Sequence, residues 1–331
     1  MQASQEARRT WRSLALGAAA LALAAGLITH AQAQPYPSKQ IKMIVPFPAG
    51  GSTDIMARLI ATEMTKSIGQ IVVVDNRGGA SGAIGADAVA KSAPDGYTLC
   101  YCTTGALAIL PFIDSKLPYN PTRDLAPVTH VLNQNFVIVA RNDLAANNVK
   151  ELVALARQDK LTFGSPGSLT PSHLTGELFK NAAGVQLLHV PYKGDQLAIV
   201  DLLGGRLDLM FQPAVVVKAQ IDGGKMKAIA ISSLTRLRSM PSLPTIAESG
   251  YPGFETHNFN AIFVPAGTPP AIIDRLRTEV VAALKTPAVA DRINADGLIA
   301  IGSTPRELAE SLKMEADVWM KVIRATGSAR D

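Results

Sequence analysis

A β-strand that runs into a glycine-rich turn and then a helix, residues 41–55, constrains the fold of this chain more than any other stretch. Ile41 to Val45 is a β-branched run of strand length, and the turn after it contains two prolines and the pair Gly50-Gly51. Glycine lets the backbone approach a bound atom closely, and the N–H groups at a helix start carry about half a positive charge. The turn is therefore predicted to bind an anion, which we interpret as a carboxylate.

The helix after this turn is predicted from its apolar periodicity. Its apolar face is expected to consist of Ile55, Leu59, Ile60, Met64 and Ile68. The helix should end at Gly69, and either Ser52 or Asp54 can cap its start. For Asp54 two roles stay open: a favourable charge at the helix N-terminus, or the orientation of a water or a donor hydroxyl.

Two further strands end in small and polar residues. Residues 71–74 form one strand, followed by a glycine-rich loop at 75–85, and residues 97–104 form the next. The glycines of the 75–85 loop do not fit the spacing G-x-G-x-x-G, so this loop is not a dinucleotide fingerprint. Ligands of open α/β sheets bind outside the carboxyl ends of the strands, so the three loops are predicted to converge on one crevice.

A second α/β pattern follows a long extended segment at residues 128–141. Its predicted helices begin at residues 149, 171 and 195, and its predicted strands are 161–164, 187–190, 207–211 and 228–231. Residues 258–264 form a strand that returns to the first pattern, and the helices 272–284 and 305–323 should pack on it. The chain is thus predicted to be an α/β protein of two domains joined by two crossover strands, a hinged clamshell.

The first 33 residues have the features of a secretory signal peptide. Three arginines precede an uncharged run from Leu14 to Ile28, and Ala31-Gln32-Ala33 follows. A membrane anchor needs about 20 apolar residues, and this run is shorter. We expect cleavage near Ala33 and a soluble mature protein in the periplasm, whose formal net charge falls from +5 to +3.

Nucleic-acid binding has little support, because the chain contains no run of five Lys or Arg residues and few aromatic residues. The only cysteines, Cys100 and Cys102, are two residues apart in a predicted strand. Same-face neighbours in a strand lie near or beyond the usual spacing for a bridge, so a disulfide would be strained. They are interpreted as two small buried residues, and a metal site would need further ligands.

The sequence offers no pattern typical of an enzyme. The G-x-S-x-G, P-loop and H-E-x-x-H patterns are absent. His130, His189 and His257 are isolated and are interpreted as structural, whereas His173 lies in a predicted first helical turn beside serines. The chain is therefore expected not to be an enzyme, and a periplasmic hydrolase is retained as the alternative from another functional class.

Several segments in chain order resemble the Bug solute-binding proteins, the TctC-like receptors of tripartite tricarboxylate transporters. They are residues 45–54, 75–77, 95–99, 117–119, 190–194, 201–205 and 265–269. The resemblance implies a periplasmic binding-protein fold (a type II-like clamshell), and capture of a small carboxylate for delivery to integral membrane permease subunits or to a sensor. It also implies that the loop Phe47–Gly51 holds one carboxylate partly through water, and that residues 168–173 receive the rest of the ligand.

The chain departs from the family pattern at three places: Gly78, the run Asn258-Phe259-Asn260, and Asp195. Asp195 stands where a small residue is usual. Its carboxylate can cap the helix 195–203, or it can face the cleft and repel a second acid group or pair with a ligand ammonium. Both interpretations stay open, so the resemblance does not fix a preference for dicarboxylates.

The domains are expected to be residues 34–135 with 259–331 (domain 1) and residues 136–258 (domain 2). The ligand is expected to be a small mono- or dicarboxylate, with or without an amino group, bound by a monomer without metal or cofactor. The candidate binding residues are Phe47, Pro48, Ala49, Gly50, Gly51, Ser52, Asp54, Ala80, Thr103, Thr104, Ser165, Ser168, Ser172, His173, Tyr192 and Asp195.

Overall fold

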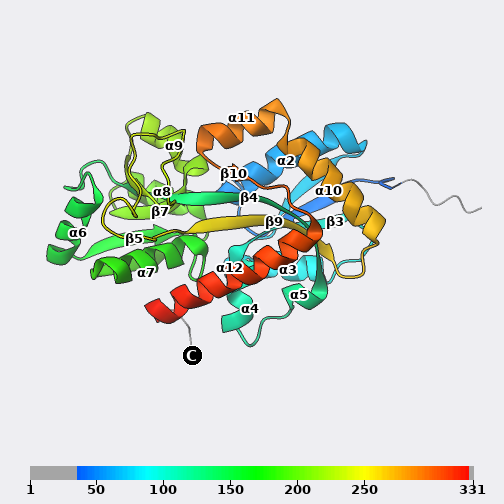
Figure 1. Cartoon of the computed structure of the whole chain (residues 1–331), viewed down its shortest axis with the longest axis horizontal. Coiled ribbons are helices and arrows are strands. Elements are labelled where there is room, and N and C mark those ends of the chain that lie inside the picture. The colour runs from blue at the N-terminus through cyan, green and yellow to red at the C-terminus, as the bar shows by residue number, and fades with distance from the viewer. Residues whose placement is uncertain (1–35, 328–331) are drawn as a thin grey trace, which may run out of the picture. The chain divides into compact units, whose positions relative to one another are not determined.

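The mixed sheet of the computed structural model is built from short strands around one long strand. The structure describes residues 36–327, so the predicted signal peptide lies outside the described residues. The strands are β1 (Ile41–Val45), β2 (Val72–Asn76), β3 (Thr98–Thr103), β4 (Leu125–Ala140), β5 (Leu161–Ser165), β6 (Leu187–Pro191), β7 (Leu209–Pro213), β8 (Lys227–Ile231), β9 (His257–Pro265) and β10 (Ile299–Ala300). Their order is β2-β1-β3-β9-β4-β7-β5-β6, with β8 and β10 also paired to β4 (Figure 1).

Both crossing segments predicted from the sequence are strands. β4 pairs antiparallel with β9 along most of the length of β9, and its C-terminal part pairs with β7 and β8. We call β1, β2, β3, β9, β10 and the N-terminal part of β4 the first half of the sheet, and the remainder of β4 with β5–β8 the second half. Within each half the outer strands are parallel, which confirms the predicted α/β fold class.

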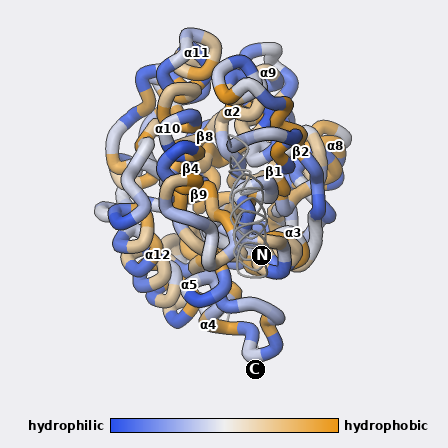
Figure 2. Tube along the Cα trace, turned by 90° about the vertical axis from the view of Figure 1, so that its right-hand side faces the viewer, coloured by the Kyte–Doolittle hydropathy of each residue, from blue (hydrophilic) through white to orange (hydrophobic). Residues whose placement is uncertain are grey.

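Helices cover both faces of the sheet (Figure 1). The longer ones are α2 (Ser52–Ile68), α3 (Ala83–Ala90), α6 (Val149–Gln158), α7 (Pro171–Ala183), α8 (Asp195–Leu203), α9 (Ala214–Asp222), α10 (Pro270–Leu284), α11 (Pro287–Asp296) and α12 (Pro305–Thr326). Short helical segments occupy Ala80–Gly82, Gly105–Ile109, Leu110–Ile113 and Pro121–Asp124. Figure 2 shows hydrophilic and hydrophobic residues alternating along α12, as expected for a helix with one face on the core.

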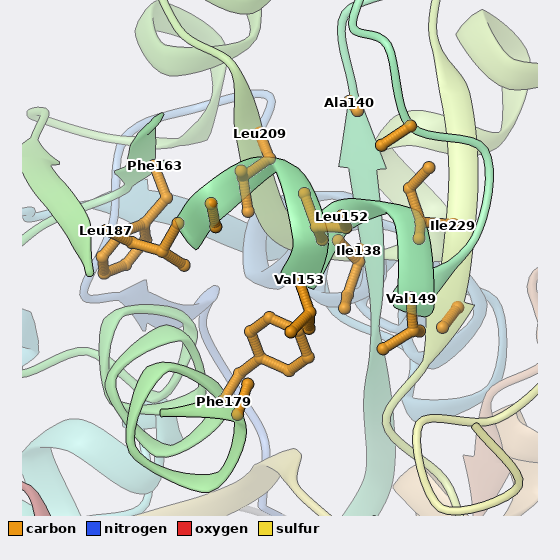
Figure 3. Packing of buried hydrophobic residues seen from close by; sticks show 14 of the residues in the cluster. Ile138, Ala140, Val149, Leu152, Val153, Phe163, Phe179, Leu187, Leu209 and Ile229 are labelled. Carbon is orange, nitrogen blue, oxygen red and sulfur yellow. The ribbon is translucent and has the colours of Figure 1, made fainter. Parts of the chain in front are cut away.

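Each half has its own apolar core. In the second half, side chains from α6 and α7 pack on the strands, with Phe163, Phe179 and Leu209 fully buried (Figure 3). In the first half the core lies between the strands and α3, and α12 closes it with Leu308 and Leu312. No helix of the described residues is long and apolar enough to cross a membrane.

The start of α2 differs from the prediction. Its cap residue is Gly51, which has no side chain, so neither Ser52 nor Asp54 caps it. The predicted end is confirmed, because Gly69 adopts a left-handed conformation with φ of 81°. The predicted apolar face is partly shifted: Ile60, Met64 and Ile68 are buried, but Ile55 and Leu59 are only partly so.

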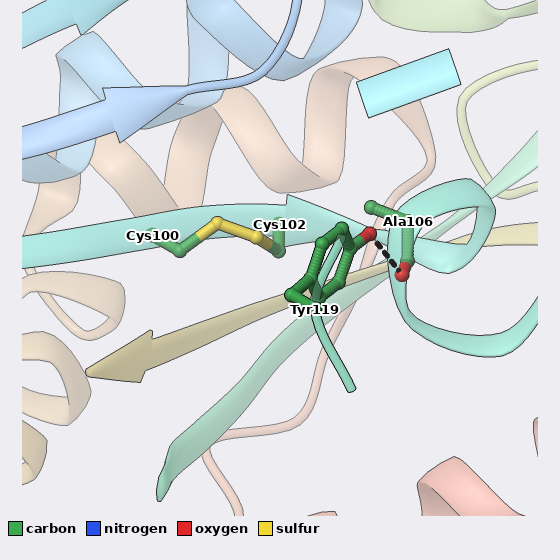
Figure 4. The surroundings of a disulfide bond; sticks show 4 residues. All are labelled: Cys100, Cys102, Ala106 and Tyr119. Atoms are coloured by element: carbon green, nitrogen blue, oxygen red, sulfur yellow. Dashed lines mark hydrogen bonds between the residues drawn. A yellow bond between two sulfur atoms is a disulfide. The ribbon is translucent and has the colours of Figure 1, made fainter. Parts of the chain in front are cut away.

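The two cysteines are buried as predicted, but the expectation that they are unpaired was wrong, because Cys100 and Cys102 form a disulfide in β3 (Figure 4). Two residues of a regular strand span about 6.6 Å, which is at the upper limit for a bridge. Here the Cα atoms are 5.2 Å apart, so the strand is locally contracted enough to allow the bond. Both side chains are fully buried.

Candidate functional site

A small cavity of about 30 Å³ lies where the two halves of the sheet meet. Phe47, Ser52, Thr53, Thr103 and Asn258 line it from the first half. Its remaining lining residues are Phe136, Pro166, Thr170, Pro171, Ser172, Asp195, Gln212 and Pro213. We call it the inner cavity. The predicted convergence of the loops after β1 and β3 is therefore observed, and the second half contributes the opposite wall.

A larger cavity of about 770 Å³ adjoins the same loops, and we call it the outer cavity. Phe47 lines both cavities. The outer cavity also touches the predicted residues Pro48, Ala80, Ser168 and Tyr192. A third space of about 180 Å³ touches Ala49, Gly51 and Asp195. Eleven of the sixteen candidate residues therefore line one of these three spaces: Phe47, Pro48, Ala49, Gly51, Ser52, Ala80, Thr103, Ser168, Ser172, Tyr192 and Asp195.

Two N–H groups of the glycine turn already have carboxylate partners within the protein. The Gly50 N–H donates to Asp54 Oδ2 at 2.9 Å, and the Ser52 N–H donates to Asp195 Oδ2 at 3.1 Å. Asp54 also accepts from Arg58 and Asn76. Burial opposes ionisation of Asp54, but these hydrogen bonds outweigh it and lower its pKa. Asp54 thus fixes the shape of the turn from inside it.

Asp195 reaches the turn from the other half of the sheet. The cap residue of α8 is Gly194, and Asp195 is the first helical residue, so its carboxylate does not cap its own helix. It lies instead on the first N–H of α2. Burial raises the pKa of Asp195, while the Ser52 N–H and the nearby Gln212 amide act in the opposite direction. One carboxylate therefore lies at the N-termini of two helices, α2 and α8.

Two further hydrogen bonds join the halves around the cavities. The Gln196 side chain donates to the Gly50 carbonyl at 2.6 Å, and the Ser81 hydroxyl donates to the Ser168 carbonyl. Together with the bond from Ser52 to Asp195, they place the two walls in direct contact.

Several buried polar atoms around the inner cavity have no hydrogen-bond partner among the described residues. They include Thr103 Oγ1, Asn258 Oδ1 and Gln212 Oε1. On neighbouring strands, Gln134 pairs in register with Asn258 and is also unpartnered. Buried polar groups nearly always have partners, so such a concentration is typical of a site that binds a polar ligand or water.

Five candidate residues are not among those lining the three spaces. Gly50 and Asp54 hold the turn as described. Thr104 Oγ1 accepts from the Phe259 N–H at 2.9 Å, which ties β3 to β9. His173 Nδ1 accepts from the Leu169 N–H at 3.1 Å. The ring centroids of His173 and His189 are 3.9 Å apart.

The fifth, Ser165, forms a serine–histidine pair that the sequence did not suggest. Ser165 Oγ lies 2.7 Å from His189 Nε2 and donates its proton to the Gly167 carbonyl. Burial lowers the pKa of His189 to about 4, so the ring is neutral near pH 7. Ser165 Oγ also accepts from the Gly167 N–H at 3.3 Å. These hydrogen bonds tie the start of the 165–170 loop to β6.

Sequence reasoning missed Gln212, Phe136 and Thr53, and it treated Asn258 only as a departure from a family pattern. Gln212 follows the apolar run Leu209–Phe211, so a polar residue at the carboxyl end of a strand was an available signal. Asn258 and Phe136 lie on crossing strands, whose side chains face the cavity only because of the pairing of β4 with β9.

Comparisons of sequence and structure with known proteins all point to one family. A family model described as "Tripartite tricarboxylate transporter family receptor" matches residues 56–327. The protein BugT of Bordetella pertussis is 40% identical, over 92% of this chain and 94% of that protein. The solved structure of the periplasmic binding protein BugD is similar, with a TM-score of 0.85 and 36% identity over 89% of this chain and 100% of BugD.

Two further solved structures contain named ligands. An R. palustris protein with adipate has a TM-score of 0.85 and 34% identity, over 88% of this chain and 98% of that one. MatC from Rhodopseudomonas palustris with bound malate has a TM-score of 0.82 and 30% identity, over 87% of this chain and 100% of that one. Both ligands are small organic carboxylates.

Proposed function

This chain belongs to the tripartite tricarboxylate transporter receptor family, and on that premise we propose that it is an extracytoplasmic receptor for a small organic carboxylate. The ligand binds between the two halves of the sheet and leaves unaltered. The observation that supports this most strongly is the pair of cavities at the meeting of the halves, with unpartnered Thr103, Gln212 and Asn258 atoms in the inner wall.

The proposed domains follow the halves of the sheet. Residues 34–135 with 259–331 form one lobe and residues 136–258 the other, and β4 and β9 carry the chain between them. Opening separates the Phe47–Ser52 turn from Asp195 and Gln196, which admits the ligand. Closure then buries it, because the closed state offers contacts from both walls.

We also propose a cellular location and a partner for this protein. The signal peptide is cleaved near Ala33, the mature monomer is periplasmic, and closure presents a surface to integral membrane permease subunits of the tripartite tricarboxylate type. Binding needs no metal or cofactor, since hydroxyl, amide and backbone groups provide the hydrogen bonds. Each bond to a charged group contributes roughly 1.5–3 kcal/mol, so three or four suffice for micromolar capture after the costs of association.

A thermal-shift screen tests this function. The panel contains mono-, di- and aromatic carboxylates, with and without amino groups, and the methyl ester of each. We expect at least one free carboxylate, at about 100 times its Kd, to raise the Tm by roughly 5 °C, and its ester to have little effect.

Mass spectrometry of the mixture after incubation distinguishes binding from catalysis. A receptor leaves every compound intact, whereas a hydrolase consumes an ester or amide. A panel in which no carboxylate raises the Tm, or in which an ester is consumed, would contradict the proposed function.

A further inference from the structure

The charge around the inner cavity is of one sign, negative. Of the residues that line it, only Asp195 carries a charge, and no Lys, Arg or His is among them. A second carboxylate placed there would face Asp195 with no cation to compensate it, which is costly in a buried setting. A positively charged group in the same position would be paired.

The unpartnered atoms of this wall supply acceptors. Thr103 Oγ1, Asn258 Oδ1 and Gln212 Oε1 are all without a hydrogen-bond partner among the described residues, and all three side chains are more than nine-tenths buried. A protonated primary amine has three donors and no acceptor, so it matches a carboxylate together with neutral oxygen atoms. The cavity volume of about 30 Å³ suits a group the size of water or ammonium.

Asp195 is held in place for this role by the opposite half of the sheet. Its Oδ2 accepts from the Ser52 N–H at 3.1 Å, and α8 fixes its backbone. This contact also fills the position on the α2 N-terminus that would otherwise attract the ligand's own carboxylate. Burial raises the pKa of Asp195 although the Ser52 N–H and the Gln212 amide act in the opposite direction, which agrees with a carboxylate that has no cationic partner.

The outer cavity has the complementary feature. Lys193 lines it, two residues before Asp195, and no ion pair of Lys193 is present among the described residues. Asp114 lines the same cavity, so the outer space carries one charge of each sign. Phe47 borders both cavities, so the two spaces lie next to each other at this residue.

We propose that Asp195 is the specificity-determining residue of this site and that it selects carboxylates that carry a protonated primary amine. The ammonium group lies in the inner cavity against Asp195, Asn258 and Gln212, and the carboxylate lies on the side of the outer cavity. This inference rests on the proposed function and narrows its ligand class.

The test is a titration with matched pairs of compounds: aspartate with malate and succinate, and 4-aminobutyrate with butyrate. Wild-type protein is expected to bind at least one amino compound at least 10-fold more tightly than its amine-free partner. Asp195→Asn should remove this preference, and Asp195→Ser should do the same, with binding of succinate or malate equal to or better than in the wild type.

Asp222→Asn is the matched control, because Asp222 is a surface carboxylate on α9 that pairs with Lys218. It should keep the wild-type preference, and circular dichroism should show that all three variants are folded. If the wild type shows no preference for the amino compounds, or if both Asp195 variants keep that preference, the inference is overturned while the proposed function stands. If the wild type binds no carboxylate of either kind, the proposed function itself fails.

Discussion

Gly51 leaves no room for a side chain in the turn that precedes α2. A Cβ atom there would lie 2.7 Å from Asp195 Oδ2, and the φ of Gly51 is −77°, which any residue can adopt. Gly50, in contrast, has φ of 81°, so a larger residue would strain the backbone whatever space it had. Gly51 is therefore the position at which the contact between the halves can be disturbed without straining the turn.

Gly51→Ala should displace the Asp195 carboxylate from the Ser52 N–H. We expect the affinity for the best ligand of the screen to fall about 10-fold, equivalent to about 1.4 kcal/mol, because a wall of the site has moved. Isothermal titration calorimetry measures this change in affinity.

Gly69→Ala is the matched control for this change. It lies at the other end of α2 with φ of 81°, so the substitution should lower the stability by about 1 kcal/mol and leave the affinity unchanged. Equal affinities for wild type and Gly51→Ala would show that the position of Asp195 does not matter to the ligand.

At the scale of elements, start signals in the sequence were sufficient to predict some of the helices. Thr170 with Pro171 predicted the start of α7, and the Thr170 hydroxyl does accept from the His173 N–H. The helix α11 was missed although Pro287 and Gly297 mark its ends in the same way. The helix α9 was missed for a different reason: its run of three valines favours a strand, and only tertiary packing makes it helical.

The contact of Asp195 with Ser52 could not be predicted, because 143 residues separate them and no local pattern reports such a distance. The same holds for the face that Asn258 presents, which depends on the register of β9 with β4. Sequence thus predicted most of the elements and the position of the turn, but it missed α9 and α11 and predicted poorly which side chains meet across the cavity.

A hydrogen bond between β9 and α12 predicts a pH-dependent stability. His257 Nε2 lies 2.6 Å from Glu315 Oε1. Burial opposes the charge on His257, but the hydrogen bond and the charge of Glu315 outweigh it and raise the pKa of His257. The folded pKa is thus above the unfolded value, so the contribution is fully present below about pH 6.5 and is lost as the pH rises through the folded pKa.

Glu315→Gln keeps the shape of the side chain and removes its charge. Urea unfolding at pH 5.5 and 8.5 should show wild type more stable than the variant by about 1.5 kcal/mol at the lower pH, with a smaller difference at the higher pH. A difference that is equal at both values would contradict a charged His257 in the folded protein.

At the scale of the whole molecule, the sheet explains how one chain provides two walls. The first half gives the turn after β1 and the end of β3, and the second half gives the loop 166–170, α8 and the end of β7. Among the described residues, β4 is the strand that pairs with strands of both halves. A small rotation about this strand and β9, as in hinge motion, would separate Asp195 from Ser52, and it would also shift the contact of Leu174 in α7 with Trp319 in α12.

The most direct test of a site between the halves is a crystal structure with the best ligand of the screen. The ligand should lie between the two halves, unaltered, in contact with Phe47 and with at least one residue of the second-half wall such as Ser168, Ser172, Asp195 or Gln212. A ligand bound elsewhere on the molecule, or one cleaved in the site, would contradict the account.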